Sequence, residues 1–397
     1  MSRYLKKCPV CYKKRTYLFL QKSNFSYFTY PLKQISKKKL IKRYTFKKLF
    51  ENLKTKLCLN CGHIFIYSLP NEKILKCLYE NHYIYFLSEN QKKLSIDSRE
   101  NKFLLELRSL NLDKPQILEI GCNDGYLLHQ LQEKGFSVTG IEPGSSGLIA
   151  KKRGINVYQK YYSPNLFKKE KKVFDLIICR HLVEHIKECQ SFVSGLKQNL
   201  SPSGIIALEV PNVEYYINSK SAETMFLQHY HYFSFYSIGR LLSINGFRII
   251  KKVNQSSDMI IFAEQKKHKT FFVPKSWYIK CKNFKRKITK KNVQIEKLLK
   301  KTIFKYKKGL CWGAGGYSYQ LFHNFPFIEK HIDYIIDRDH RKWGRSFVNN
   351  NIQIKSPESI KFDNYNFVII CSSMFAETIK KDLITKKFKG KVITIHL

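Results

Sequence analysis

The chain has 397 residues, 43% of them hydrophobic, and a formal net charge of +42 at pH 7. This hydrophobic content is enough for packed cores and argues against a wholly disordered chain, and the length predicts two or three domains. No apolar run approaches the ~20 residues that a membrane helix needs, so we expect no transmembrane segment. Eleven cysteines, with no signal-peptide core in residues 1–10, predict a cytoplasmic protein with reduced thiols.

The positive charge is compatible with several partners. Lys and Arg neutralise phosphates, so nucleic acid is one candidate, and an anionic membrane face or a nucleotide-linked substrate would be attracted equally. Lys, Asn, Ile, Tyr and Phe are abundant together, which is typical of an AT-rich genome and needs no functional explanation. The charge is densest in residues 37–48 and 266–308, but it does not by itself identify a partner.

Two Cys-x-x-Cys pairs near the N-terminus predict a metal site. Cys8 pairs with Cys11, and Cys58 pairs with Cys61. Four thiolates form the tetrahedral sulfur set that Zn²⁺ prefers in structural sites. His63 could replace a cysteine, although a turn position after glycine is the commoner explanation. We therefore expect a zinc-binding domain over residues 1–70.

A glycine-containing turn at residues 118–125, Leu-Glu-Ile-Gly-Cys-Asn-Asp-Gly, follows a predicted strand over 116–120. Gly121 and Gly125 would let the backbone approach a ligand closely. Glu142 ends the next predicted strand, 21 residues after Gly121. That spacing is near the one that brings a carboxylate onto ribose hydroxyls, so the turn predicts a nucleoside-binding half-fold.

The charge of the turn indicates which nucleoside it suits. A dinucleotide turn would read G-x-G-x-x-G and direct a helix N-terminus at a pyrophosphate. Here Glu119 and Asp124 are poor neighbours for a phosphate and better ones for a ligand with an amino group. The turn resembles motif I of the class I S-adenosylmethionine-dependent methyltransferases, in which the acid orients the methionine end. A nucleotide-free or NAD-binding unit is the alternative.

Further strands and helices follow in alternation. Residues 174–179 form an apolar run of the kind found in buried parallel strands. Residues 180–185 (Arg-His-Leu-Val-Glu-His) resemble the segment after the fourth methyltransferase strand. Residues 205–210 are the predicted fifth strand. The alternation predicts an α/β fold with a doubly wound sheet, in a methyltransferase core over residues 71–265. The resemblance assigns the cofactor to Glu119, Gly121, Asn123, Asp124, Gly125, Glu142, Pro143 and Arg180.

A histidine-containing aromatic segment, residues 226–235, comes after the fifth strand. Methyl transfer requires alignment and, for a poor nucleophile, a base, and histidine titrates near neutrality. His229 and His231 are therefore the predicted catalytic residues, since ligands bind outside the carboxyl ends of parallel strands. A structural role is the alternative for each of them.

The C-terminal third predicts a second nucleotide-binding type of fold. After a basic helical linker over 266–308, residues 310–316 (Leu-Cys-Trp-Gly-Ala-Gly-Gly) open a strand–turn–helix unit, and Asp337 ends its next strand near the ribose spacing. Ser318 stands where the third glycine of a dinucleotide fingerprint would fall, which argues against NAD. We expect a Rossmann-like domain over residues 309–397.

The paired cysteines, the Ile-Gly-Cys-Asn-Asp-Gly turn and a histidine segment ending in Tyr232-Phe233-Ser234 together resemble the sugar C-methyltransferase family of deoxysugar biosynthesis. That family joins a zinc-binding domain, a class I core and a Rossmann-like domain, and methylates nucleotide-linked keto sugars with a histidine base. Its usual active-site run is Tyr-His-Glu-His. Alignment places His229 on the last histidine and Phe226, Leu227 and Gln228 on the other three positions, so O- or N-methylation is at least as open as C-methylation.

The resemblance also implies a substrate site for a sugar or nucleotide sugar. In related enzymes a tyrosine ahead of motif I closes the cofactor site, which makes Tyr83 and Tyr85 candidates. An RNA methyltransferase with a zinc module is the alternative, although the chain lacks an Asp/Asn-Pro-Pro-aromatic motif and a Pro-Cys pair. The implied substrate-binding residues are His181, His185, Gly313, Gly315 and Asp337.

Overall fold

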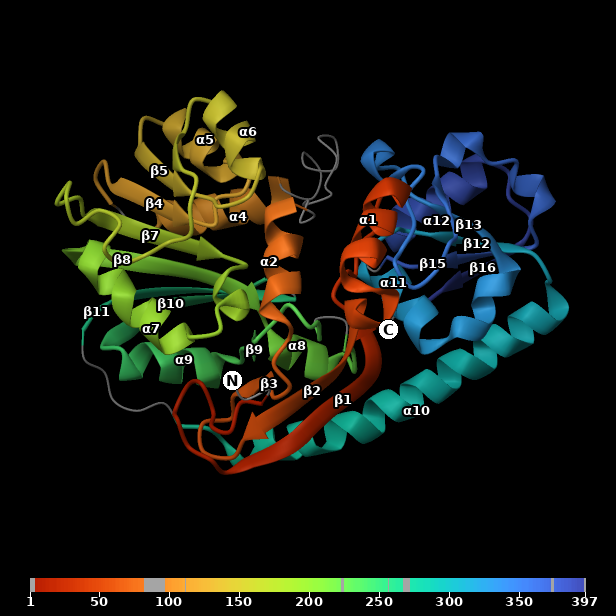
Figure 1. Ribbon diagram of the computed structural model, residues 1–397, viewed down its shortest axis with the longest axis horizontal. Coiled ribbons are helices and arrows are strands. Elements are labelled where there is room, and N and C mark those ends of the chain that lie inside the picture. The colour runs from red at the N-terminus through yellow and green to blue at the C-terminus, as the bar shows by residue number, and fades with distance from the viewer. Residues whose placement is uncertain are drawn as a thin grey trace.

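Three β-sheets carry the fold (Figure 1). The computed structural model describes residues 4–81, 97–110, 112–222, 225–255, 257–266, 272–372 and 375–395. The strands and helices below are those of the described residues. None of their helices combines the length and apolar character required to cross a bilayer.

One strand of the N-terminal sheet comes from the predicted catalytic segment, residues 226–235. Its order is β1-β2-β3-β9, and β9 pairs antiparallel with β3 so that Phe65 faces His231 and Ile64 faces Tyr232. The N-terminal unit and the segment around His229 are thus parts of one hydrogen-bonded sheet. The elements are β1 (Thr16–Ser26), β2 (Phe50–Cys58), β3 (Ile64–Ile66), β9 (His231–Tyr232), α1 (Gln34–Tyr44) and α2 (Glu72–Asn81).

The central sheet has seven strands in the order β10-β11-β8-β7-β4-β5-β6, with only β11 reversed in direction. This confirms the predicted doubly wound α/β fold. Helices cover both faces in Figure 1. The strands are β4 (Gln116–Ile120), β5 (Ser137–Ile141), β6 (Asn156–Tyr158), β7 (Phe174–Arg180), β8 (Leu200–Pro211), β10 (Phe247–Gln255) and β11 (Asp258–Gln265). The helices are α4 (Asp97–Arg108), α5 (Tyr126–Gln132), α6 (Ser146–Lys152), α7 (Cys189–Leu196), α8 (Val213–Asn218) and α9 (Phe235–Ile244).

The order of this sheet fixes where a ligand can bind. Successive strands run outward from β4 to β6 on one side and from β7 to β8 on the other, so the winding changes direction between β4 and β7. At such a switch point the connections leave in opposite directions, and a crevice opens at the carboxyl ends of the two strands. The predicted cofactor turn begins at the end of β4.

The C-terminal sheet is wholly parallel, in the order β14-β13-β12-β15-β16, with its own switch point between β12 and β15. Its last strand, β16, ends at Thr394. The elements are α10 (Lys275–Lys305), β12 (Gly309–Trp312), α11 (Gly316–Asn324), β13 (Ile332–Ile336), β14 (Ile354–Lys355), β15 (Phe367–Ile370), α12 (Ala376–Thr385) and β16 (Lys391–Thr394).

A single apolar core joins the N-terminal sheet to the C-terminal sheet. Phe25 of β1 packs edge-on against Tyr319 of α11, with ring centroids 5.2 Å apart, and Phe19 stacks on Phe284 of α10 at 5.1 Å. Lys37 of α1 is buried and donates to the carbonyl oxygens of Phe347 (3.0 Å) and Asn350 (2.8 Å). The N-terminal sheet therefore lies between the other two and packs on the C-terminal one.

Candidate functional site

The four predicted zinc ligands lie together at the end of the N-terminal sheet where β1 begins and β2 ends. All four sulfur atoms lie within 4.8 Å of one another, with Cys8 Sγ 3.6 Å from Cys61 Sγ and Cys11 Sγ 3.5 Å from Cys58 Sγ. A tetrahedral site with Zn–S bonds of ~2.3 Å requires sulfurs roughly 3.8 Å apart, so the residues fit the ion. Burial and the neighbouring sulfurs raise the pKa of Cys8, so four thiolates need a cation to coexist here.

His63 lies outside this sulfur cluster. Its ring is fully buried and its Nε2 is 3.1 Å from Nδ1 of His231. The other ring nitrogen of His231, Nε2, lies 2.8 Å from the carbonyl oxygen of Ile186. Burial lowers the pKa of His231 to about 4, so both of its contacts are made by a neutral ring. This geometry leaves His231 no ring nitrogen for a substrate proton and favours a structural role.

The two glycines of the predicted cofactor turn serve different purposes. Both have left-handed backbones, with φ of 78° at Gly121 and 70° at Gly125. A Cβ on Gly125 would lie 2.7 Å from Cβ of Ala150, so this glycine allows the turn to pack on α6. A Cβ on Gly121 would make only ordinary contacts with Leu182, 3.5 Å away. Leu182 therefore lies beside Gly121, and it is the left-handed backbone that favours glycine at this position.

Glu142 joins the turn to the end of β5. Its carboxylate accepts hydrogen bonds from the backbone N–H of Asn123 (3.1 Å) and of Gly144 (2.8 Å). Burial raises its pKa against the effect of these two donors. The Ser146 hydroxyl is a third donor to this carboxylate, so of its roughly four acceptor positions about one remains for a ribose hydroxyl. Pro143 follows directly and directs the chain into the bend before α6.

Three other predicted cofactor residues, Glu119, Asp124 and Arg180, differ in their surroundings. Glu119 is almost fully buried at the end of β4. Asp124 forms an ion pair with Arg153, 3.3 Å apart, on the side of the turn that faces α6. Arg180, at the end of β7, is held by fully buried Glu209 at 2.6 Å. Seven of the eight residues therefore gather around the ends of β4 and β5, and Arg180 lies across the switch point.

His181 follows Arg180 and lies among carboxylates. Its Nδ1 is 3.6 Å from Glu184 and its Nε2 is 3.9 Å from Glu209. Burial lowers the pKa of His181, but the carboxylates of Glu184, Asp258 and Glu209 outweigh it and raise the pKa to about 9. His181 is therefore a cation at neutral pH, at the carboxyl end of β7 where the substrate was predicted to lie.

A second group of side chains, the histidine cluster of Tyr79, Glu184, His185 and His229, lies beside it. Ligand atoms of Glu184, His185 and His229 lie within 4.8 Å of one another, and the two imidazole rings are 4.7 Å apart between centroids. Glu184 and His185 belong to a short 3₁₀ turn, η3 (Val183–His185). Glu184 is buried, and its histidine neighbours outweigh the burial so that its pKa is lowered.

The protonation of His185 follows from its contacts. Nδ1 lies 3.0 Å from the carbonyl oxygen of Gln228 and 2.9 Å from the hydroxyl of Tyr79. A carbonyl oxygen can only accept, so Nδ1 carries the proton and Nε2 carries a lone pair. Burial lowers the pKa of His185 despite the charge of Glu184, which keeps the ring neutral. The ring of His185 can therefore accept a proton at Nε2.

Tyr79 was missed by the sequence analysis. It lies on α2, and the backbone oxygen of Tyr79 would be 3.3 Å from a Cβ on Gly144, next to Glu142. Helix α2 therefore covers the site from the N-terminal side, the place where a closing tyrosine was expected. The candidates Tyr83 and Tyr85 lie outside the described residues. No local signal distinguishes Tyr79, because its partner His185 is 106 positions away.

Phe226 connects the histidine cluster to the C-terminal sheet. Its ring centroid is 5.5 Å from that of His229, and a Cβ on Gly316 would lie 3.4 Å from the same ring. Gly316 begins α11, directly after the predicted turn. A Cβ on Gly313 would meet the backbone oxygen of Cys371 at 2.8 Å, whereas the space beside Gly315 is open. The N-terminus of α11 thus faces the histidine cluster across Phe226.

Asp337 braces this second turn. Its carboxylate accepts from the N–H of Ala314 (2.8 Å), from Nζ of Lys342 (2.9 Å) and from the N–H of Asp339 (2.9 Å). With three acceptor positions in use, Asp337 holds the turn and has little capacity left for a ribose diol. Its predicted role as a direct substrate ligand stays a prediction.

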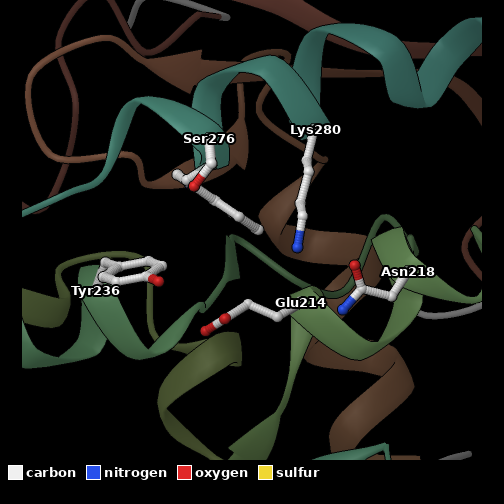
Figure 2. A pocket seen from close by; sticks show the side chains of 6 residues that line it. Glu214, Asn218, Tyr236, Ser276 and Lys280 are labelled. Carbon is white, nitrogen blue, oxygen red and sulfur yellow. The ribbon is translucent and has the colours of Figure 1, made fainter.

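Two hollows of the surface lie away from these strand ends. One, of about 30 Å³, is lined by residues of α8, α9 and the start of α10, and Figure 2 shows Lys280 reaching into it toward Glu214 and Asn218. That volume holds little more than one water molecule. The other, of about 400 Å³, lies at the amino ends of β7 and β8, opposite to the cofactor turn. Neither adjoins the histidine cluster.

The chain was compared with known protein families. Residues 82–252 match a family described as a methyltransferase domain, and residues 274–395 match one described as a C-methyltransferase C-terminal domain. The chain contains a class I methyltransferase domain. The second match coincides with α10 and the C-terminal sheet, so the methyltransferase domain is followed by a partner domain known from C-methyltransferases.

Individual relatives resemble only part of the chain. A ubiquinone biosynthesis O-methyltransferase of Rickettsia canadensis is 30% identical over 108 residues, 26% of this chain and 45% of the relative. The chain thus spans less than half the length of this curated relative. Magnesium protoporphyrin IX methyltransferase of Synechocystis is 16% identical with a TM-score of 0.38, over 49% of this chain and 99% of its own. An S-adenosylmethionine-dependent methyltransferase of Clostridium acetobutylicum is 12% identical with a TM-score of 0.35, over 42% and 90%.

Proposed function

We propose that the protein transfers a methyl group from S-adenosylmethionine to a sugar that is linked to a nucleotide, at a carbon next to a carbonyl group. The observation that carries this proposal is the continuous path of contacts from the end of β7 through His185, His229 and Phe226 to the N-terminus of α11. Residues at the two ends of this path would contact the sugar and the diphosphate of a single ligand.

The turn after β4 suits S-adenosylmethionine. The remaining acceptor position of Glu142 would take a ribose hydroxyl, the left-handed turn at Gly121 would bring the backbone close to the ligand, and Glu119 would face its amino group. When bound, the cofactor supplies a sulfonium methyl group for in-line displacement. The protein then has to align the acceptor and remove its proton.

The histidine cluster supplies the base. His229 takes the proton from the carbon next to the carbonyl, and the two electrons of the broken C–H bond pass into an enolate. The enolate carbon would then form the new C–C bond to the methyl group as the bond from that methyl to sulfur breaks, and S-adenosylhomocysteine would be the leaving group. Neutral His185, fixed by Gln228 and Tyr79, lies against His229 and can accept the proton in turn. The partner domain, related to those of C-methyltransferases, favours carbon over oxygen as the methylated atom.

The C-terminal turn suits the diphosphate of the acceptor. Backbone N–H groups at the start of a helix attract anions, and α11 has nine residues, begins at Gly316 and has no acid in its first turn. The open side of Gly315 leaves room for the phosphates. Gly313 and Asp337 would shape this turn, whereas Gly315 would touch the ligand.

Zinc completes the proposal as a structural ion. The four cysteines come from a turn before β1 and from the turn between β2 and β3, so a bound Zn²⁺ would tie these two turns together at one end of the N-terminal sheet. The set has four protein ligands, which is typical of structural sites rather than catalytic ones.

A matched glycine pair tests the cofactor site. Gly121→Val should abolish binding of S-adenosylhomocysteine in isothermal titration calorimetry, because a branched side chain would lie where the ligand approaches the turn. Circular dichroism has to show a folded variant, since φ of 78° strains any side chain at this position. Gly125→Ala should instead lower the stability, because its Cβ meets Ala150. Full affinity in a folded Gly121→Val protein would contradict the assignment of the turn.

Acceptor titrations test the substrate class. Binding of S-adenosylhomocysteine should tighten in the presence of a nucleotide-linked keto sugar, and NMR of the product should locate the new methyl group on carbon. A methyl group on oxygen would retain the sugar but exclude the enolate step. Indifference to all sugars, with RNA retained at physiological salt, would replace the proposal with RNA methylation.

A further inference from the structure

Helix α10, which the methyl-transfer site does not use, presents a strongly basic outer face. More than a third of its 31 residues are Lys or Arg, and Glu296 is the only acidic residue within it. In Figure 1 the helix runs along the outer edge of the molecule, from the N-terminal sheet to the C-terminal one. At 1.5 Å per residue it is about 46 Å long, so it offers an extended positive surface.

The inner face of α10 is fixed to the protein. Trp277 is buried and donates its Nε1–H to the carbonyl oxygen of Gly62 at 2.9 Å. Phe284 stacks on Phe19, and Leu299 is fully buried. Figure 2 shows the first turns of the helix above α8 and α9, with Lys280 directed toward Glu214. The orientation of the helix is therefore set, and its opposite face is held outward.

The exposed side of the helix carries apolar residues interspersed with basic ones. Positions spaced by three, four or seven lie on one side of an α-helix, and the exposed line consists of Ile279, Arg286, Lys290, Val293, Lys297 and Phe304. The apolar members are unusually open, with 59% of Ile279, 45% of Val293 and 90% of Phe304 accessible. Phe272, just before the helix, is 80% accessible. Phe272 and Phe304 gain little from packing in the protein itself, and Ile279 and Val293 are only partly covered.

We propose that this face of α10 docks the protein on an anionic lipid surface. A helix lies in a membrane interface when apolar side chains protrude among basic ones, because the former enter the acyl boundary while the latter bind acidic headgroups. Phosphates of nucleic acid would bind the basic residues equally well, but they would not bury the exposed side chains of Ile279, Val293 and Phe304. Charge complementarity and the apolar line together therefore identify a bilayer as the partner.

The test is flotation of the full chain with vesicles of phosphatidylcholine, with and without phosphatidylglycerol. We expect binding to the acidic vesicles only, weakening as salt rises. The variant Arg286→Glu/Lys290→Glu/Lys297→Glu should lose affinity by at least about a hundredfold, since each basic residue near such a surface contributes roughly fivefold and the new glutamates are repelled. The variant Ile279→Ser/Val293→Ser/Phe304→Ser keeps the charge and should also bind more weakly.

A matched control separates this face from the overall charge. The variant Lys134→Glu/Lys151→Glu/Lys152→Glu makes the same change in net charge at exposed positions of the methyltransferase domain, and it should float like the wild type. Equal losses in both charge variants would overturn the proposal, since general attraction would then suffice. It would also fall if the serine variant bound vesicles undiminished, or if RNA, but not vesicles, bound the wild type in a gel-shift assay.

Discussion

His229 and His231 are two positions apart, yet the contacts of their rings differ. The ring of His229 faces His185 and Phe226, whereas both nitrogens of His231 are engaged with His63 and Ile186. His229→Ala should lower kcat by roughly 10²–10⁴-fold, the usual contribution of a general base, while binding of S-adenosylhomocysteine is kept.

His231→Ala serves as the contrast. Loss of two buried hydrogen bonds and of ring volume should lower the free energy of unfolding by about 2–4 kcal/mol, with a smaller effect on kcat of the folded protein. Urea unfolding and single-turnover rates measure the two effects separately. If His231→Ala stops turnover and His229→Ala does not, the base has been assigned to the wrong histidine.

The raised pKa of His181 predicts how stability depends on pH. The folded pKa of about 9 lies above the ordinary value of 6.5, so the stabilisation is fully present below about pH 6.5 and is lost as pH rises through 9. The urea midpoint of the wild type should therefore fall more steeply between pH 7 and 9.5 than that of His181→Gln. Parallel curves for the two proteins would show that His181 is not a stabilising cation.

At the scale of elements, strand β9 links the cysteine cluster to the histidine cluster. Cys58 ends β2, Cys61 precedes β3, and β3 pairs with β9, two residues after His229. Removal of the metal with a chelator should thus lower the melting temperature and also kcat, while affinity for S-adenosylhomocysteine at the distant β4 turn changes little. Metal analysis before and after, with restoration by added Zn²⁺, provides the control. Unchanged kcat after complete removal would show that β9 holds without the ion.

Some of these elements could be predicted from the sequence and others could not. The parallel strands were predictable because each is a short apolar run followed by a turn; the predicted strand at 116–120 coincides with β4. Strand β9 has two residues and no periodicity, and its partner β3 is more than 160 positions away. Such a strand is fixed by tertiary contacts alone. For the same reason, His185 was predicted from a resemblance, but its contact with Tyr79 was not predicted.

At the scale of the whole molecule, the three sheets share buried side chains and should unfold together. One apolar cluster includes residues of β1, of the segment around Tyr230, of α10 and of the C-terminal sheet, and a second cluster joins Phe65 of β3 to strands of the central sheet. Differential scanning calorimetry should therefore show one main transition instead of one for each predicted domain. Two resolved peaks, one of them shifted by S-adenosylhomocysteine, would show that the C-terminal sheet unfolds independently.

The sequence predicted the three parts of this architecture but not how they combine. Each part has its own local motif, whereas the packing of Phe25 on Tyr319 and the bonds of Lys37 to the C-terminal sheet depend on residues about 300 positions apart. Local periodicity and motif spacing do not predict such contacts. The path of contacts through Phe226 therefore forms only when the separate parts pack together, and it could not be predicted from the sequence.

The shared strand has a consequence for engineering. A chimaera that exchanged residues 1–70 for those of a relative with another acceptor would also replace β3, the strand on which His231 and Tyr232 are aligned. The incoming unit would then impose its own position on the loop that carries His229. Acceptor preference and the N-terminal unit should consequently be inherited together, and grafts that include residues 226–234 should outperform those that stop at either boundary.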